Sequence, residues 1–74
     1  MAVEVELFGQ LASGRPQRQT LSLEQPMTVQ QVAIRLGLDP KQVGLIVING
    51  VQSELDDPVP PMGRLCFFPP VSGG

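Results

Sequence analysis

The sequence predicts an α+β domain, in which a mixed sheet of four to five strands carries one main helix packed on one face. Three observations support this class. Short stretches alternate apolar and polar residues, one stretch repeats apolar residues at helical spacing, and strands are predicted on both sides of that helix. A chain of 74 residues is one domain at most, and we expect this domain to cover 1–68 and an extended tail to cover 69–74.

Two strands are predicted in the first third of the chain. Residues 3–7 alternate apolar residues with two glutamates, which indicates a half-buried strand. Two glycines and a proline within 9–17 indicate a turn, and alternation resumes over 18–23. We expect these strands to pair as an antiparallel hairpin.

The main helix is predicted to begin at Thr28, because Gln31 completes a Thr-x-x-Gln capping box. Apolar residues then follow at i, i+3, i+4 and i+7, which places them on one core-facing stripe: Val29, Val32, Ala33 and Leu36. Gly37 suits a left-handed C-cap, and residues 39–43 predict a short helical turn with Pro40 at its first position.

The apolar run 45–48 indicates a buried strand. Asn49-Gly50 is a strong hairpin-turn pair and leads into a short edge strand over 51–53. Three prolines and three acidic residues in 54–63 indicate a loop. The last strand is predicted over 65–68, and the two prolines that follow end it because proline cannot donate to the ladder.

The composition excludes several classes of function. The net charge is −2 and the basic residues are scattered, which argues against nucleic-acid binding. Without histidine or a glycine-rich phosphate loop, we expect no independent catalysis, no metal site and no cofactor bound by this chain. The sequence has no apolar stretch long enough for a membrane helix, no signal-peptide pattern and one cysteine, which favours a cytoplasmic location.

Other polar positions have ordinary structural interpretations. Cys66 lies among apolar residues with no histidine to activate it, so packing is favoured over a role as nucleophile. Arg64 could guide the tail, although a solvated loop residue is the favoured interpretation. Asp56 and Asp57 supply too few ligands for a good cation site.

The C-terminal end is the most informative part of the sequence. Gly73 and Gly74 follow a predicted strand and the stiff lead Phe68-Pro69-Pro70-Val71-Ser72. Glycine has no Cβ, so the pair makes a backbone thin enough for a narrow channel. The pattern predicts that the chain presents its terminal carboxylate as a chemical handle; an ordinary frayed end is the alternative.

Strand parity predicts a second surface. If the apolar positions of the first and last strands face the helix, Phe8 and Phe68 both point to the opposite, open face of the sheet. Two phenylalanines there indicate a partner-binding patch, which Val51 is expected to join. The alternative is a register shift or bulge that buries either ring.

The element order and the last eight residues resemble a known family. A hairpin, one helix and a last strand that runs into Gly-Gly resemble the β-grasp of ubiquitin-like proteins. More narrowly, the last residues are similar to the C-terminal signature of the molybdopterin synthase small subunit, MoaD, in the MoaD/ThiS family of sulfur carriers: Phe67-Phe68-Pro69-Pro70-Val71-Ser72-Gly73-Gly74. The segments Val5-Glu6-Leu7-Phe8-Gly9-Gln10 and Ile48-Asn49-Gly50 are similar to the same family.

The resemblance implies a non-catalytic, sulfur-carrying subunit. An E1-like (MoeB-like) partner would use ATP and magnesium to adenylate Gly74, and a sulfur donor protein would displace AMP to leave a thiocarboxylate. The tail would then enter a large, MoaE-like subunit that forms the dithiolene of the molybdenum or tungsten cofactor. The residues expected to contact partners are Phe8, Val51, Phe68, Pro69, Pro70, Val71, Ser72 and Gly73.

Two departures from the family pattern leave other pathways open. Residues 60–64 stand in place of an Asp-Gly-Asp-Glu-like turn, and the segment after the first strand lacks the charged helical stretch that the family often has. Sulfur carriers for thiamine or cysteine synthesis share the fold and the Gly-Gly end. A ubiquitin-like modifier joined to lysines through Gly74, and a plain interaction module with an incidental tail, are further alternatives.

Overall fold

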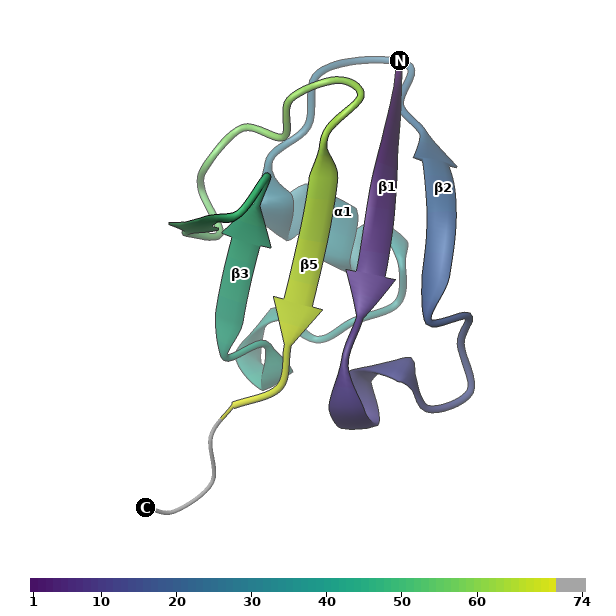
Figure 1. The fold of residues 1–74 in the computed structure, drawn as a ribbon, viewed down its shortest axis with the longest axis vertical. Coiled ribbons are helices and arrows are strands. Elements are labelled where there is room, and N and C mark those ends of the chain that lie inside the picture. The colour runs from purple at the N-terminus through teal and green to yellow at the C-terminus, as the bar shows by residue number, and fades with distance from the viewer. Residues whose placement is uncertain (71–74) are drawn as a thin grey trace.

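The computed structural model describes residues 1–70. These residues form one sheet with an α-helix behind it (Figure 1). Within these residues the strands are β1 (Ala2–Leu7), β2 (Arg18–Ser22), β3 (Leu45–Ile48), β4 (Val51–Ser53) and β5 (Arg64–Phe68). The helical elements are α1 (Val29–Arg35) and the single 3-10 turns η1 (Gly9–Ala12) and η2 (Pro40–Gln42). The predicted α+β class, with a mixed sheet and one main helix, is confirmed.

The order of strands in the sheet is β2-β1-β5-β3-β4. β1 and β5 are parallel neighbours at the centre, whereas the other pairs are antiparallel. In register, Leu7 lies opposite Phe67 on one side of β5, and Ile46 lies opposite it on the other. The last strand therefore occupies the middle of the sheet, and the chain leaves the domain from the centre of one end.

The predicted ends of the helix are confirmed. The Thr28 hydroxyl accepts a hydrogen bond from the Gln31 amide at 3.2 Å, and the Gln31 side chain accepts one from the Thr28 amide at 2.9 Å. Gly37 takes a left-handed φ of 82°, and the Leu38 amide donates to the Ala33 carbonyl at 2.9 Å. None of the helices in residues 1–70 has the length and hydrophobicity of a membrane-spanning segment.

The sheet has one covered face and one open face. Side chains on the covered face pack against α1 and form the core, which includes Val3, Val5, Leu7, Val29, Val32, Ala33, Leu65 and Phe67. Within residues 1–70, no polar or charged residue is buried. Figure 1 shows α1 (seven residues) behind the sheet, and no helix of residues 1–70 covers the opposite face.

Two local expectations need correction. The segment 9–17 was expected to be a turn alone, but it contains η1, which buries Leu11 at the end of the core. The run 45–48 predicts a buried strand, but Leu45 is 38% exposed and only Ile46 of the four residues is buried. The physical reason is that one layer of helix covers one face only, so the other half of an apolar strand stays open.

Candidate functional site

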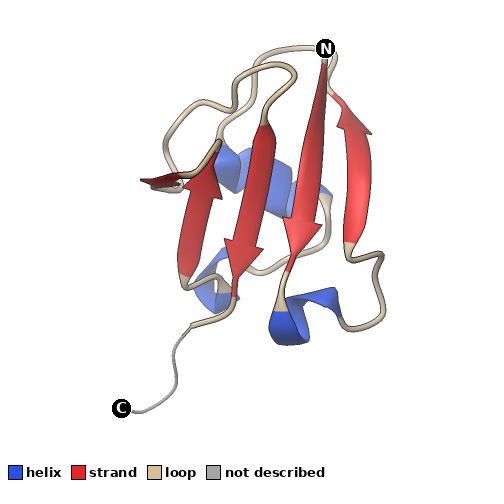
Figure 2. Ribbon diagram, in the orientation of Figure 1, coloured by secondary structure: helices blue, strands red, loops and turns tan. Residues whose placement is uncertain are grey.

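The candidate site is the place where the chain leaves the sheet. β5 ends at Phe68, and the two prolines that follow are the last described residues. Figure 2 shows that this end of β5 lies at the same end of the sheet as the two short helical turns, η1 and η2. The predicted site residues Val71, Ser72, Gly73 and Gly74 lie outside the described residues. The described part of this region is residues 68–70, which we call the tail root.

Backbone hydrogen bonds hold this root from both sides. The Phe8 amide, just past β1, donates to the Phe67 carbonyl at 3.0 Å. The Gly44 amide, just before β3, donates to the Phe68 carbonyl at 2.8 Å. Strand pairing thus continues beyond both neighbouring strands and secures β5 up to its last residue.

The two phenylalanines predicted on the open face lie against each other. The rings of Phe8 and Phe68 are stacked, with centroids 4.3 Å apart and planes 7° apart. Each side chain is half-buried. The parity prediction is confirmed, and the alternative in which a bulge buries one ring is wrong, because the paired register runs unbroken to Phe68.

The sequence analysis missed two further apolar residues of this surface. Leu45 lies directly opposite Phe68 in the β3–β5 register, and Val47 lies opposite Cys66, so all four point to the open face. Together with Phe8 they form a cluster that we call the apolar end. The available signal was the alternation within 45–48, which places Leu45 and Val47 on the face opposite to buried Ile46.

Val51 does not belong to this surface. The two-residue turn at Asn49 and Gly50, with φ of 51° and 83°, pairs Val51 directly with Ile48. Ile48 in turn lies opposite Leu65, which is fully buried on the helix-covered face. The expectation that Val51 joins the phenylalanines is therefore wrong in its placement: the side chain is 65% exposed, but at the edge of the other face.

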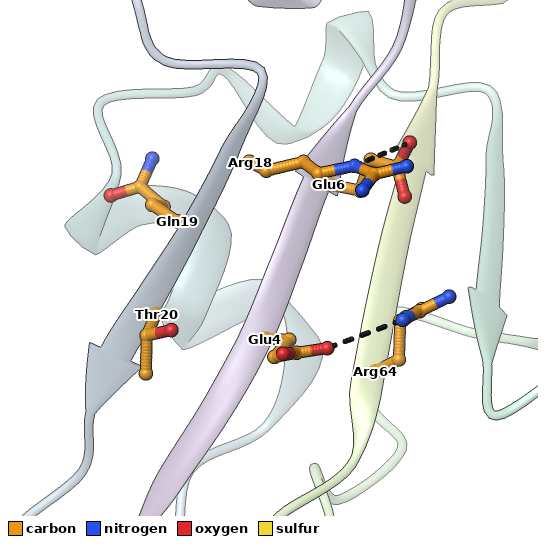
Figure 3. A pocket seen from close by; sticks show the side chains of 6 residues that line it. All are labelled: Glu4, Glu6, Arg18, Gln19, Thr20 and Arg64. Atoms are coloured by element: carbon orange, nitrogen blue, oxygen red, sulfur yellow. Dashed lines mark hydrogen bonds and ion pairs between the residues drawn. The ribbon is translucent and has the colours of Figure 1, made fainter.

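The remainder of the open face is charged. Glu6 pairs with Arg18 at 3.5 Å, and Glu4 pairs with Arg64 at 3.4 Å, so that two ion pairs bridge three neighbouring strands (Figure 3). These four residues, which we call the charged end, line a hollow of about 200 Å³ together with Gln19 and Thr20. Equal numbers of both signs give the hollow no strong net charge, so it suits a specific polar contact better than capture of a free ion.

The structure also places the other polar residues considered from the sequence. Arg64 is the first residue of β5, not part of the preceding loop. The Asp57 carboxylate accepts a hydrogen bond from the Glu54 amide at 2.8 Å, which gives it a role in the local turn. Burial raises the pKa of the Cys66 thiol, and Glu6 raises it further against a smaller opposing effect of Arg64. A raised pKa keeps the thiol protonated, which fits a packing role.

A mixed sheet with a central parallel pair, one covering helix and a last strand that leads out of the centre defines the ubiquitin-like β-grasp. Three solved structures share this fold. SAMP1 from Haloferax volcanii has a TM-score of 0.72 and 24% identity, with 100% of both chains covered. A second structure of small archaeal modifier protein 1 from H. volcanii has a TM-score of 0.72 and 20% identity, over 95% of this chain and 98% of that one. A putative molybdopterin converting factor, subunit 1, from Pyrococcus furiosus has a TM-score of 0.71 and 19% identity, over 96% and 99%.

The chain belongs to the ThiS family, whose model matches residues 5–74. The match covers all of the domain after the first four residues and continues through the Gly-Gly end. The resemblance to MoaD/ThiS-like sulfur carriers is thereby confirmed at the level of the family. No curated protein matches the chain.

Proposed function

We propose that this chain is a sulfur carrier that holds sulfur as a thiocarboxylate on Gly74 and serves as the small subunit of a molybdopterin synthase. The main observation behind the proposal is the sequence of the last eight residues, 67–74, which begins within the central strand of the sheet, β5. The membership of the ThiS family and the fold shared with a putative molybdopterin converting factor subunit support it.

The chemistry on Gly74 belongs to partner proteins. The sequence has no histidine, and Cys66 is the only thiol, with a pKa that burial raises. An E1-like, MoeB-like enzyme supplies ATP and magnesium: a carboxylate oxygen attacks the α-phosphorus and pyrophosphate leaves. Sulfur from a donor protein, at the oxidation level of sulfide, then attacks the acyl carbon, and AMP leaves as the carbon–sulfur bond forms.

The apolar end is the surface by which partners hold the domain. It lies beside the tail root, so in a partner that covers Phe8 and Phe68 the tail enters at the edge of that interface. Aromatic residues of this kind commonly dominate binding energy at interfaces. Pro69 and Pro70 then lie at the mouth of the channel that leads to the partner's reacting groups. Val71, Ser72 and Gly73 occupy that channel, where a MoaE-like subunit transfers the sulfur to a pyranopterin precursor.

Intact-mass spectrometry tests this function. The chain is incubated with the host's E1-like enzyme, ATP, magnesium and a sulfur donor, and we expect the mass increase that exchange of one oxygen for one sulfur produces. A chain extended by one alanine after Gly74 is the matched control and should gain no sulfur. An unchanged mass of the unmodified chain under these conditions contradicts the proposal.

One observation favours a second candidate, a protein modifier. Two of the structures that share the fold are of SAMP1, a small archaeal modifier protein. This candidate predicts isopeptide adducts between Gly74 and lysines of other proteins in host lysate, detected by mass spectrometry of captured chains. Lys41 is the only lysine in the sequence, so chains of the modifier on itself would have one side-chain acceptor.

Carriers for thiamine or cysteine synthesis are separated by the acceptor. All of them share the thiocarboxylate, so the intact mass does not distinguish them. Supplying the loaded chain with a molybdopterin synthase large subunit, a thiazole synthase or a cysteine synthase, each together with the small molecule that accepts the sulfur, does distinguish them. Only the right enzyme and acceptor take the sulfur and return the chain to its carboxylate mass.

A further inference from the structure

Two glycines from distant parts of the chain meet at the tail root. Gly9 lies just after β1, and Gly44 lies just before β3. Both are next to the segment Pro69-Pro70, which follows the central strand. The sequence places Gly9 in a predicted turn and in the segment similar to the family's first strand, and it predicts no role for Gly44.

Gly44 is required for space, not for its backbone conformation. Its φ lies outside the left-handed region, so any residue could adopt its conformation. A Cβ at this position would lie 2.7 Å from both the Pro69 carbonyl oxygen and the Pro70 nitrogen, and would also collide with the Pro70 Cα. These are backbone atoms and cannot rotate out of the way, so the tail root occupies the room that a side chain would need.

Gly9 bounds the same segment from the other side. A Cβ there would lie 2.9 Å from Cγ of Pro69. Gly9 also has a left-handed φ of 60°, as does Gly14 with 73°, but a Cβ on Gly14 would meet no atom within 4 Å. An alanine at either position would be strained by the left-handed φ, but only an alanine at Gly9 would also collide with the tail root. Comparing the two substitutions therefore separates the effect of this contact from the effect of the strain.

We infer that Gly9 and Gly44 form an exit cradle that receives Pro69-Pro70 and fixes the direction in which the C-terminal tail leaves the domain. Proline locks its own φ and restricts the residue before it to extended conformations. The contact with Gly44 therefore sets the direction of the backbone, and the stiff Pro69-Pro70 segment keeps that direction over two residues. The inference rests on the proposed function, because it assigns the cradle the task of positioning the terminal carboxylate.

The magnitude of the effect follows from covalent geometry. Four residues follow Pro70 in the sequence and can span at most about 14 Å. A 20° change in exit direction moves the far end of such a span by about 5 Å. A misplacement of about 1 Å can cost about a hundredfold in rate, so the exit direction is a sensitive determinant of transfer.

The first experiment measures the cradle itself. Amide hydrogen exchange at position 44 reports the bond from its N–H to the Phe68 carbonyl, which remains possible in Gly44→Ala. We expect Gly44→Ala and Gly9→Ala to lose protection at this amide by about tenfold or more, and the matched control Gly14→Ala to keep it. Wild-type protection in Gly44→Ala would overturn the inference.

The second experiment measures positioning. Pyrophosphate release is followed with the E1-like enzyme, ATP and magnesium, with each variant as the carboxylate substrate. We expect Gly44→Ala to lower the maximal rate by about tenfold to a hundredfold, with the half-saturating concentration changed much less because the apolar end stays in place. Gly14→Ala should behave as the wild type. Lost protection at position 44 with an unchanged maximal rate would overturn the positioning role.

A third variant covers the case in which Gly44→Ala does not fold. Pro70→Gly leaves both glycines intact and removes the stiffness beyond the cradle. We expect normal protection at the Gly44 amide and a reduced maximal rate, whereas a wild-type rate would contradict the inference. If the E1-like enzyme releases no pyrophosphate with the wild-type chain as substrate, the proposed function fails. Hydrogen exchange at the amide of position 44 still decides whether the cradle exists.

Discussion

Phe67 and Phe68 are neighbours with identical side chains, but they face opposite sides of the sheet. Phe67 is fully buried under α1, in the core. Phe68 is half-buried on the open face and stacks on Phe8. The two faces of this small domain therefore differ in role: one face supplies the stability, and the other presents an apolar surface beside the tail root.

The largest expected effect is on the covered face. Phe67→Ala should lower the free energy of unfolding by about 3–5 kcal/mol, because it removes a buried ring and leaves a cavity. For a domain of this size such a loss is a large part of the total stability. Chemical denaturation measures it, with Phe68→Ala as the control. Equal losses for the two variants would contradict the division by face.

The next effect concerns binding through the open face. Phe68→Ala should weaken binding to the E1-like enzyme by about tenfold or more, since truncation of a central aromatic residue at an interface commonly costs that much. The control is Ile34→Ala, which removes an exposed apolar side chain from α1, behind the sheet. Titration calorimetry measures both. A greater loss of affinity for Ile34→Ala would place the docking surface on the helix side of the domain and contradict docking through the open face.

The smallest effect is expected at the charged end. The Glu4–Arg64 pair is exposed on both sides, and such pairs contribute about 0–1 kcal/mol to stability. Arg64→Gln should therefore leave the unfolding midpoint nearly unchanged, while any change in the rate of partner association should shrink at high salt because exposed charges are screened. A large, salt-independent loss of stability would show that the pair has a structural role.

Local patterns in the sequence predict much of this division. The alternation in the first and last strands predicts correctly that Phe8 and Phe68 share the open face. The capping box at Thr28 is likewise a local signal, because both of its hydrogen bonds form between residues three positions apart. Signals of this kind are readable because the physics acts within one strand or one helical turn.

The errors arise where the face depends on contacts between elements. The alternation of side chains within one strand does not tell which face the next strand of a hairpin presents, because the length of the turn sets how the two strands pair. Here the two-residue turn pairs Val51 with Ile48 on the covered face. The apolar run 45–48 would be buried on both sides only if two layers covered the sheet, and residues 1–70 supply one such layer. The cradle of Gly9 and Gly44 joins positions that only the folded sheet brings together.

We propose that partners hold the domain by its open face, beside the tail root. Chemical-shift mapping of the isotopically labelled chain, free and bound to the E1-like enzyme, tests it most directly. We expect the largest shifts at Phe8, Leu45 and Phe68, with small changes along α1. Shifts concentrated on α1, with the apolar end unchanged, would contradict it.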